Sequence, residues 1–398
     1  MNKNILILGA SGGVATALLT YLQDHRDIVG KLVLIDKSNR LLSREHINHK
    51  KLDYTFVHKE IKIPEEKEEY KSILRQHKID IVLDLTDMET LPLFKYTDSL
   101  GISYVNTALN DDNLTIAEIA ELLYPQLPQL HHSPHILCAG MNPGIVNAWV
   151  REGIEKYGMP KSITHFEYDT SMIKESWRPL ITWSIHEFLV EAFRDQSGRV
   201  HGRKNLEVLH PNGLMHKVNM QSILEPIMKL DAYPDGFQIL HEENLTIGEK
   251  YNVPTQFVYA IHPKTMKHLV QLYNQKGDIS EKDLILGENI EYPLTGSDSI
   301  GVLLQYADKD VYYFNTVKSE DLTNISATYF QVIMGVLAAL KVLLNGELQK
   351  GTYFTEDLYN TSYHKNVFSL LVIEEFVFPK IDIAEKVNSD ANRLQNNL

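Results

Sequence analysis

Cysteine is almost absent from this 398-residue sequence. Cys138 is the single cysteine, so the chain cannot form an internal disulfide. Proteins of reducing compartments dispense with disulfides, and we therefore expect a cytoplasmic location. The first residues agree with this expectation. They enter an apolar strand at once and lack the ordered basic stretch, long apolar run and cleavage site of a signal peptide.

Positive charge is also scarce. The 39 Lys and Arg residues are outnumbered by 52 Asp and Glu residues, which gives a formal net charge of −13. Nucleic-acid and anionic-membrane surfaces bind through Lys and Arg, so the balance argues against both partners. It is compatible with a cationic small-molecule substrate, because an acidic cleft concentrates cations. We also expect no apolar run long enough to span a bilayer.

Strand and helix patterns alternate through the first third of the chain. The predicted strands are residues 4–9, 31–36, 55–61, 79–86, 102–108 and 135–140, and the predicted helices are residues 14–25, 65–77, 91–101 and 114–124. Such alternation is typical of an α/β fold with a doubly wound parallel sheet, of the dinucleotide-binding (Rossmann) kind. We assign residues 1–142 to this domain.

A glycine-rich turn joins the first strand to the first helix. Its spacing is G-x-x-G-x-x-A, a variant of the dinucleotide fingerprint, formed by Gly9, Gly12 and Ala15. Gly9 allows the tight turn, Gly12 lets the backbone approach a pyrophosphate, and Ala15 lets the helix lie against the strand. A plain turn in a domain that binds no nucleotide explains the same residues, and this alternative stays open.

An acid closes the second predicted strand. Asp36 follows Gly9 by 27 residues, where a carboxylate would hold a ribose 2′-hydroxyl and repel a 2′-phosphate. NAD is therefore favoured, while the nearby Lys37 and Arg40 leave NADP possible. The residues that we expect to bind the cofactor are Gly9, Ser11, Gly12, Gly13, Val14, Asp36, Thr86, Asn106, Thr107 and Asn142.

A second glycine-rich corner, residues 140–144, lies at the carboxyl end of the sixth predicted strand. Open α/β sheets bind ligands at the carboxyl ends of their strands, so this corner should lie near the nicotinamide. Pro143 forces Asn142 out of the helical region and leaves its amide as a fixed donor and acceptor there. A simple turn before a helix accounts for the corner equally well.

The chain changes character after Gly158. Alternating apolar segments at 163–171, 237–247, 254–262, 299–307 and 311–317 predict an antiparallel or mixed sheet in an inserted α+β domain, residues 143–320. Residues 328–346 predict a long buried helix, and 363–378 predict a further buried segment, so that residues 321–380 return to the first domain. Residues 381–398 form a polar tail.

Trp183 lies in the segment Thr-Trp-Ser-Ile-His-Glu, residues 182–187. A tryptophan face attracts an alkylammonium group, and a nearby Glu could pair with one. Alternatively, Trp183 belongs to the core, and His186 and Glu187 begin a helix that ends near Arg194.

The most suggestive cluster is His241-Glu242-Glu243. Strand alternation would place His241 and Glu243 on one face and Glu242 on the other. A histidine beside a carboxylate is a plausible general base with its orienting partner, and solvated edge charges explain the residues equally well. Because Glu242 points away and no third ligand is spaced nearby, we expect no metal site.

Two other groups carry weaker signals. Asp298 lies in a turn, residues 296–301, where it either binds substrate or caps the turn. His131, His132 and His135 fall in or beside a proline-punctuated loop, and we interpret them as exposed linker.

Together these features resemble the homospermidine synthase branch of the saccharopine dehydrogenase-like oxidoreductases. The resembling segments follow one order along most of the chain: the glycine turn, then residues 101–111, 138–146, 181–188, 239–249, 259–263, 297–304 and the buried helix. The resemblance implies bound NAD between two domains, a homodimer, and oxidation of a diamine to an imine that a second amine attacks before the hydride returns. It places Asn142 near nicotinamide and substrate, His241 and Glu243 at the reacting amine, and Asp298 at a distal ammonium.

Trp183 matches a tryptophan of that family, but other pocket residues depart from its pattern. Asn110 replaces an acid, and His186-Glu187 replace an Asp-Gly pair. The leading hypothesis is therefore an NAD(P)-dependent oxidoreductase acting on a C–N bond of a polyamine or amino acid. The alternatives are an imine reductase of the saccharopine or carboxynorspermidine kind, and a nucleotide-binding protein without catalytic activity.

Overall fold

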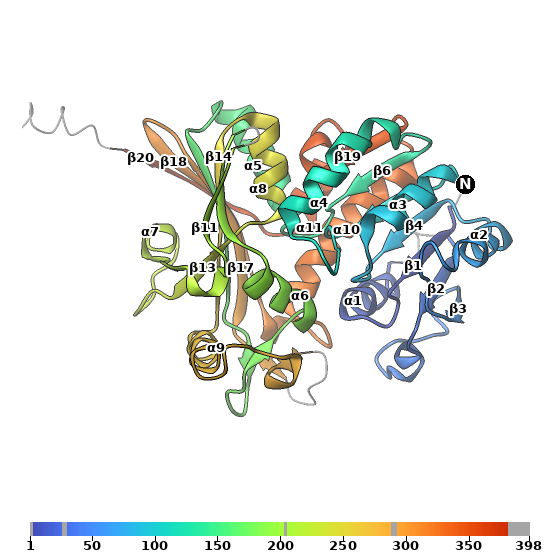
Figure 1. The fold of residues 1–398 in the computed structure, drawn as a ribbon, viewed down its shortest axis with the longest axis horizontal. Coiled ribbons are helices and arrows are strands. Elements are labelled where there is room, and N and C mark those ends of the chain that lie inside the picture. Colours follow the sequence, from blue (N-terminus) through green and yellow to red (C-terminus); the bar gives the residue numbers. More distant parts are fainter. Residues whose placement is uncertain (1–2, 26–29, 203–204, 288–292, 381–398) are drawn as a thin grey trace, which may run out of the picture.

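The computed structural model describes residues 3–25, 30–202, 205–287 and 293–380. The first domain contains a seven-stranded sheet in which every pair is parallel, in the order β19-β6-β5-β4-β1-β2-β3 (Figure 1). The strands are β1 (Ile5–Leu8), β2 (Leu32–Asp36), β3 (Tyr54–His58), β4 (Ile81–Asp84), β5 (Ser103–Asn106), β6 (Pro134–Leu137) and β19 (Gly351–Phe354). The predicted doubly wound sheet is confirmed, and its first six strands have the order 3-2-1-4-5-6.

Both faces of this sheet are covered, as the unbroken apolar strands require. Side chains of β1 alternate between two cores, so that Ile5 and Ile7 face one and Leu6 and Leu8 the other. The helices that follow the strands are α1 (Gly13–Leu22), α2 (Lys67–Gln76), α3 (Thr90–Ser99) and α4 (Ile116–Leu123). Residues of α1 pack in the first core, and residues of α2, α3 and α4 in the second.

The second domain contains a nine-stranded mixed sheet, as predicted. Its main path is β11-β10-β14-β7-β17-β18-β20, with β13 beside β14 and β12 beside β13; β14 and β7 are parallel and the other pairs antiparallel. The strands are β7 (Ser162–Asp169), β10 (Ser197–His201), β11 (Leu206–His210), β12 (Lys217–Asn219), β13 (Asp235–Ile239), β14 (Pro254–Ile261), β17 (Ser297–Gln305), β18 (Lys309–Lys318) and β20 (Glu374–Pro379).

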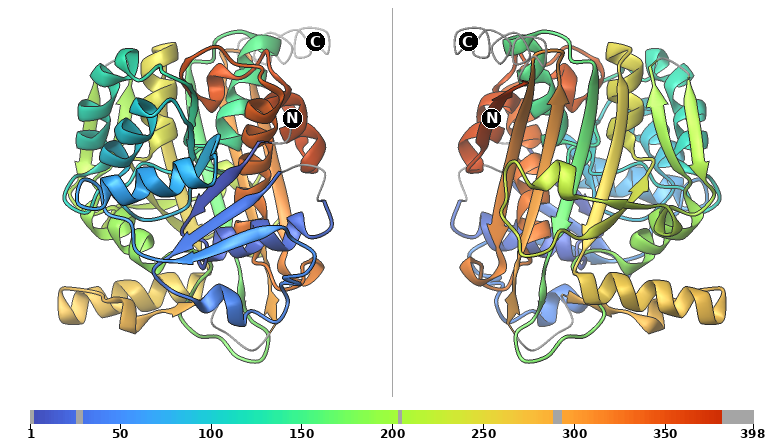
Figure 2. Two further views of the ribbon diagram at one scale, coloured as in Figure 1. Left: turned by 90° about the vertical axis from the view of Figure 1, so that its right-hand side faces the viewer. Right: turned by 90° about the vertical axis from the view of Figure 1, so that its left-hand side faces the viewer.

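The helices that lie around this sheet are α5 (Ile145–Tyr157), α6 (Ile185–Leu189), α7 (Gln221–Leu224), α8 (Glu242–Tyr251), α9 (Pro263–Lys276) and α11 (Ser362–Leu370) (Figure 2). Two small sheets pair β8 (Met172–Ile173) with β16 (Leu294–Thr295) and β9 (Leu180–Ile181) with β15 (Ile285–Leu286). One predicted strand is wrong: residues 237–247 leave β13 after Ile239 and enter α8 at Glu242.

The long apolar helix is confirmed as α10 (Ala327–Asn345), which ends at Gly346 in the left-handed conformation. It packs on α1 and α11 and against β17 and β18, so it lies between the two sheets (Figure 1). Our expectation that no apolar run has spanning length was wrong, because α10 has both the length and the composition. Its apolar stretch is 78% buried inside the fold, as expected of a core helix.

The predicted buried segment 363–378 is only half correct. Tyr363 and Val367 of α11 are buried, but β20 is the exposed edge strand of the second sheet, where Phe376 and Val377 are 37% and 41% exposed. Residues 321–380 therefore contribute to both domains. β19 is the last strand of the first sheet, beside β6, and β20 is the edge strand of the second sheet, beside β18. The predicted tail, 381–398, lies outside the described residues.

Candidate active site

A cavity of about 460 Å³ extends from the glycine turn into the second domain. It lies at the carboxyl ends of the parallel strands, where α/β sheets bind their ligands. The predicted site residues that line it are Gly9, Gly12, Gly13, Val14, Asp36, Thr86, Thr107, Asn142, Trp183 and His241. The fold therefore brings Asn142 and His241 to one cavity, as the hypothesis required.

The glycine turn has the geometry that its sequence predicted. Gly9 has a φ of +75°, and a Cβ there would lie 2.5 Å from the carbonyl oxygen of Leu85. Gly12 is the N-cap of α1, and a Cβ at Gly13 would collide with the ring of Tyr329 on α10. The residues at the start of α1, where the first amides of a helix lack intrahelical acceptors, line the cavity, as a phosphate site needs.

Asp36 lies at the end of β2 with both carboxylate oxygens held. One oxygen accepts from the Ser11 amide at 2.8 Å and the other from the Ser38 amide at 2.7 Å. Ser11 itself does not line the cavity: it is buried, and its hydroxyl donates to the Ser38 carbonyl at 2.8 Å. Ser11 therefore fixes the loop that carries Asp36.

Thr86 and Asn106 shape the neighbouring loops. The Thr86 hydroxyl donates to Asp84, and the Thr86 carbonyl accepts from the side chain of Asn110 at 2.9 Å. Asn106 is buried outside the cavity, where it accepts from the Cys138 amide at 2.9 Å and donates to the Ala108 carbonyl. Asn106 thus ties β5 to the segment that leads to the Asn142 corner.

The corner at residues 140–144 is held from two sides. Gly140 and Gly144 form an isolated bridge, and a Cβ at Gly335 of α10 would lie 2.0 Å from the Gly140 carbonyl oxygen. The Asn142 side chain donates to Glu167 at 2.5 Å. The amide of Asn142 is therefore fixed at the boundary between the cofactor end of the cavity and the acids of the second domain.

Glu167 was not predicted, and it is the main polar residue of the second sheet in the cavity. Burial first, then Asp298 and Asp169, raise its pKa well above the usual value. One of its oxygens has no hydrogen-bond partner among the described residues. Its position in β7 follows from the alternation His165, Glu167, Asp169, which places three titratable side chains on one face of the strand.

Asp298 lies on β17 in the register position opposite Asp169 of β7, and it is not among the residues that line the cavity. Its expected role as a turn cap is wrong, because it is the second residue of β17 and accepts from the Thr328 hydroxyl at 2.7 Å. Asp169 accepts from Thr182 at 2.7 Å. Burial, followed by Asp169, raises the pKa of Asp298 well above the usual value, and its other oxygen has no hydrogen-bond partner in the described part of the chain.

The three acids of β7 and β17, Glu167, Asp169 and Asp298, form a buried acid cluster. Within the described ranges, Lys and Arg make no ion pair with it. The Lys and Arg residues that line the cavity lie instead near Asp36, at the cofactor end: they are Lys37, Arg40 and Lys59. Without a cation beside them these acids hold their protons, as their raised pKa values indicate, and a cationic ligand would favour their ionised forms.

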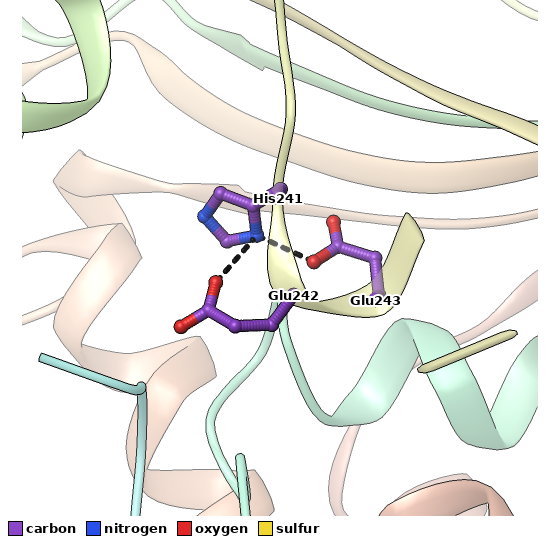
Figure 3. A group of neighbouring side chains, drawn as sticks. All are labelled: His241, Glu242 and Glu243. Atoms are coloured by element: carbon purple, nitrogen blue, oxygen red, sulfur yellow. Dashed lines mark hydrogen bonds and ion pairs between the residues drawn. The ribbon is translucent and has the colours of Figure 1, made fainter. Parts of the chain in front are cut away.

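His241 is the N-cap of α8, so the predicted strand setting was wrong. Because the chain turns into a helix here, Glu242, which was expected to point away, lies near the same ring nitrogen of His241 as Glu243 does. Nδ1 of His241 lies 2.5 Å from Glu243 and 3.2 Å from Glu242 (Figure 3). Glu242 is also held by the Leu109 amide at 2.8 Å, which links it to the first domain.

The charges around His241 favour its protonated form. Burial alone would lower its pKa, but Glu243, Glu242 and Glu191 together raise it well above the usual value. Burial would raise the pKa of Glu243, which His241 and His165 lower instead. The two groups therefore form a buried pair that shares one proton.

These three residues are also the group, among the described residues, whose donor atoms lie close enough to hold a metal ion. A separation of 2.5 Å between Nδ1 and a carboxylate oxygen is that of a hydrogen bond. Two ligands of a tetrahedral metal at about 2.0–2.1 Å from the ion would lie farther apart. The three side chains thus form a hydrogen-bonded group.

A second group of acids lies on the other side of His241. Helix α6 begins at Ile185 and continues as a π-helical turn, Val190–Arg194, which confirms the expected helix ending near Arg194. The turn places Glu191 3.5 Å from Nε2 of His241. Burial and neighbouring acids, Glu191 first among them, raise the pKa of Glu187 to about 8 and of Asp195 to about 7.

Trp183 is packed against its neighbours and also lines the cavity, and its expected contact with an ammonium group stays a prediction. Its ring packs on Phe188 and it lines the cavity, where its Nε1 donates to the Tyr259 hydroxyl at 3.1 Å. His186 instead faces Asp112 and Glu281, at 3.7 and 3.5 Å. The tryptophan, but not this histidine, is thus placed beside the acids and His241.

The histidines near residue 131 needed one correction. His131 and His132 are exposed, as expected, but His135 is fully buried at the start of β6. It contacts Asp98 at 2.8 Å and accepts from the Tyr104 amide at 3.1 Å. His135 is therefore a core residue of the first domain. Both of its ring nitrogens have hydrogen-bond partners, which makes its burial tolerable.

The first domain matches one protein family, and the whole fold is similar to that of a solved homospermidine synthase. Residues 5–133, about a third of the chain, match the family model of the saccharopine dehydrogenase NADP-binding domain. The homospermidine synthase of Legionella pneumophila, solved in complex with NAD, has a TM-score of 0.76 and 14% identity over 96% of this chain and 92% of that one. An amine dehydrogenase of Mycobacterium smegmatis has a TM-score of 0.41 and 8% identity over 90% and 96%. A comparison with curated proteins gave no match.

Proposed function

The chain carries a saccharopine dehydrogenase NADP-binding domain, a family made up mostly of oxidoreductases, and we propose from this premise that it oxidises and reduces a C–N bond of a cationic amine. The observation that carries the proposal is the buried acid cluster at Glu167, Asp169 and Asp298. Glu167 is the member of the cluster that lines the cavity, where one of its oxygens accepts from Asn142 and the other has no hydrogen-bond partner among the described residues. An ammonium group would satisfy that oxygen and favour the ionised form of Glu167.

The first domain fits a nicotinamide dinucleotide. The turn leaves no room for a Cβ at Gly9 or Gly13, and the start of α1 offers amides for a pyrophosphate. Asp36 lines the cavity and retains acceptor capacity for a ribose hydroxyl. A carboxylate there favours NAD, with NADP a weaker ligand. The bound cofactor would accept and return the hydride.

The second domain would prepare the amine. The acid cluster binds an ammonium group and Trp183 offers its ring to the charged chain. The amine that reacts must lose a proton before hydride departure, because an ammonium has no lone pair to assist. The His241–Glu243 pair would receive that proton in its deprotonated form, a neutral imidazole beside the Glu243 carboxylate, after it has released its own shared proton, and Asn142 holds the reacting end against Glu167.

The finer proposal follows the resemblance to homospermidine synthase. In that scheme the amine becomes an imine, a second amine displaces the first nitrogen, and the returned hydride gives a secondary amine. The cavity contains acids on both sides of His241, which suits two amines or a substrate with several charges. We also propose a homodimer and a cytoplasmic location, which light scattering and cell fractionation would check.

The direct test is turnover with 1,4-diaminobutane as a probe amine. Denatured protein is first assayed for released nicotinamide dinucleotide. Protein that carries bound NAD is then mixed with the amine, and the absorbance of reduced nicotinamide is followed. A synthase gives a secondary amine by mass spectrometry with no net change in cofactor. Stoichiometric cofactor oxidation on an added imine instead identifies a reductase.

His241→Gln, compared with wild type, separates binding from chemistry. We expect turnover to fall by about 100-fold or more, as for loss of a general base, while NAD binding followed by nicotinamide fluorescence is unchanged. Loss of NAD binding would move His241 out of the substrate site. Bound cofactor with no turnover of any amine in the wild type would favour a nucleotide-binding protein without catalytic activity.

A further inference from the structure

Two threonines connect the aspartates of the buried acid cluster. Asp169 and Asp298 are paired directly across β7 and β17, so their side chains leave the sheet on the same face, with Cβ atoms about 5 Å apart. Thr182, which follows β9, and Thr328, in the first turn of α10, both reach these acids. All four side chains are buried. Residues from the sheet, from the segment before α6 and from the helix between the domains thus meet at one group of oxygens.

The four side chains form one hydrogen-bonded chain. The Thr182 hydroxyl lies 2.7 Å from Asp169 and 3.0 Å from the Thr328 hydroxyl. The Thr328 hydroxyl in turn lies 2.7 Å from Asp298. All three separations lie in the normal range for hydrogen bonds between oxygen atoms. Four oxygens are therefore joined in a row by three contacts.

The number of hydrogens limits the charge of this chain. Each threonine hydroxyl can donate one hydrogen, and an ionised carboxylate can donate none. The two hydroxyls therefore supply two hydrogens for three contacts. With both aspartates ionised, one contact would bring two oxygens together without a hydrogen between them, which is costly for buried polar groups. A hydrogen at every contact requires one of the two aspartates to be a neutral carboxylic acid.

The surroundings favour Asp298 as the neutral acid. The second oxygen of Asp169 accepts from the Ser171 amide at 2.8 Å, which stabilises a carboxylate there. The second oxygen of Asp298 has no hydrogen-bond partner among the described residues. Burial raises the pKa of Asp169, but hydrogen bonds from Ser171 and Thr182 oppose this rise. The hydrogens then run from Asp298 through the two threonines to Asp169.

We propose that Thr182 and Thr328 are positioning residues that hold one proton on Asp298 and the negative charge on Asp169. Among the charged groups that act on Glu167, which lines the cavity, Asp298 has the largest effect. A neutral Asp298 removes that charge, so Glu167 ionises more readily beside an ammonium group. This consequence for amine binding rests on the proposed function, whereas the placement of the proton does not.

Other titratable groups face the two aspartates from neighbouring elements. Tyr259 lies on β14, and burial, followed by the three acids of the cluster, raises its pKa well above the usual value. His262, the N-cap of α9, acts on Asp169. Glu167 lies on the same face of β7 as Asp169. These groups act on the acids without the threonines, so a test must change the chain itself and observe the Asp298 carboxyl directly.

Infrared spectroscopy gives this direct observation, because the carbonyl stretch of a protonated carboxylic acid is separate from the bands of a carboxylate. Spectra of the full chain without ligand are recorded at pH 7. Aspartate labelled with a heavy carbon isotope distinguishes aspartic from glutamic acids, and Asp298→Asn identifies the band of Asp298. Asp298→Ala replaces this variant if it does not fold.

The contribution of the chain is tested at Thr328. Thr328→Val replaces the hydroxyl by a methyl group of similar size, with Thr328→Ala in reserve if the valine variant does not fold. Thr328→Ser keeps the hydroxyl and is the matched control. Both variants leave every acid of the cluster in place, so a difference between them reports the hydroxyl and not the surrounding charges.

We expect wild type to show an aspartic acid band that Asp298→Asn removes. The same band should remain in Thr328→Ser and should move to higher frequency or disappear in Thr328→Val, because the acid has lost the acceptor of its proton. Identical aspartic acid bands in wild type and Asp298→Asn would overturn the proposal, as would an unchanged band in Thr328→Val. The measurement needs no amine, so failure of every amine to react would count against the proposed function and leave this inference standing.

Discussion

Glu187 offers the sharpest test of the electrostatics of the cavity. It lines the cavity next to Glu191, and its neighbours include Asp87, Glu242 and Asp112. Replacing it with Gln keeps the size of the side chain and removes its ability to ionise. We expect Glu187→Gln to stabilise the ligand-free protein at alkaline pH, because the folded chain then no longer places a charge among other acids.

The sign and size follow from linkage. Burial and neighbouring acids raise the pKa of Glu187 from 4.5 to about 8, so the folded state holds its proton more tightly than the unfolded state. Stability is therefore lost as the pH rises from the unfolded value toward 8. At 1.36 kcal/mol per unit, the limit is roughly 5 kcal/mol above pH 8. Partial exposure screens this, and we expect about 2–3 kcal/mol.

The assay is thermal unfolding at pH 5 and pH 8.5. An unfolding entropy of about 2.1 cal/mol/K per residue makes 2–3 kcal/mol worth about 3 °C in Tm for a chain of this size. We expect that gain for Glu187→Gln at pH 8.5 and almost none at pH 5. Glu121→Gln, on the exposed surface of α4, serves as the control and should change neither value. A gain that is equal at both pH values would refute the linkage argument.

Three further substitutions test other parts of the site. Asp36→Ala should weaken NAD binding by about tenfold and spare NADP, because one hydrogen bond to a charged acceptor is lost; fluorescence titrations that show equal losses would contradict the assigned ribose contact. Asn142→Ala leaves Glu167 without its donor, and kcat with 1,4-diaminobutane should fall by at least tenfold while NAD affinity is retained. Gly335→Ala pushes a methyl group onto the Gly140 carbonyl and should cost about 1–3 kcal/mol, visible as a lower Tm.

The first domain was predictable because its signals are local. Each strand, turn and helix follows the next, and the turn at Gly9 has the spacing that the fold requires. The outer neighbour of β6, β19, could not be predicted from such a local signal. β19 is a four-residue strand, more than 200 residues away, that pairs through its backbone, and its sequence has no distinctive alternation. Only the tertiary fold selects that pairing.

The errors at the site have a similar cause. The alternating charges after Ile239 suggested a strand, whereas Asn244, placed to accept from the His241 amide, is an N-terminal helix signal that could have been recognised. Glu167 and Glu191 were missed because each lies in an ordinary strand or helix pattern. Their importance arises from the register of β7 with its neighbours and from the π-helical turn.

The place of β19 also matters for how the protein is made. During synthesis, β6 leaves the ribosome long before Gly351 and the rest of its outer neighbour. At about 5–20 residues per second, the wait is about 10–40 s. For that time the outer edge of β6 lacks its strand, and the face later covered by α10 is open, which are two features that promote aggregation. An excised nucleotide domain ending at residue 142 would keep both defects permanently, so the cofactor site should be studied in the intact polypeptide.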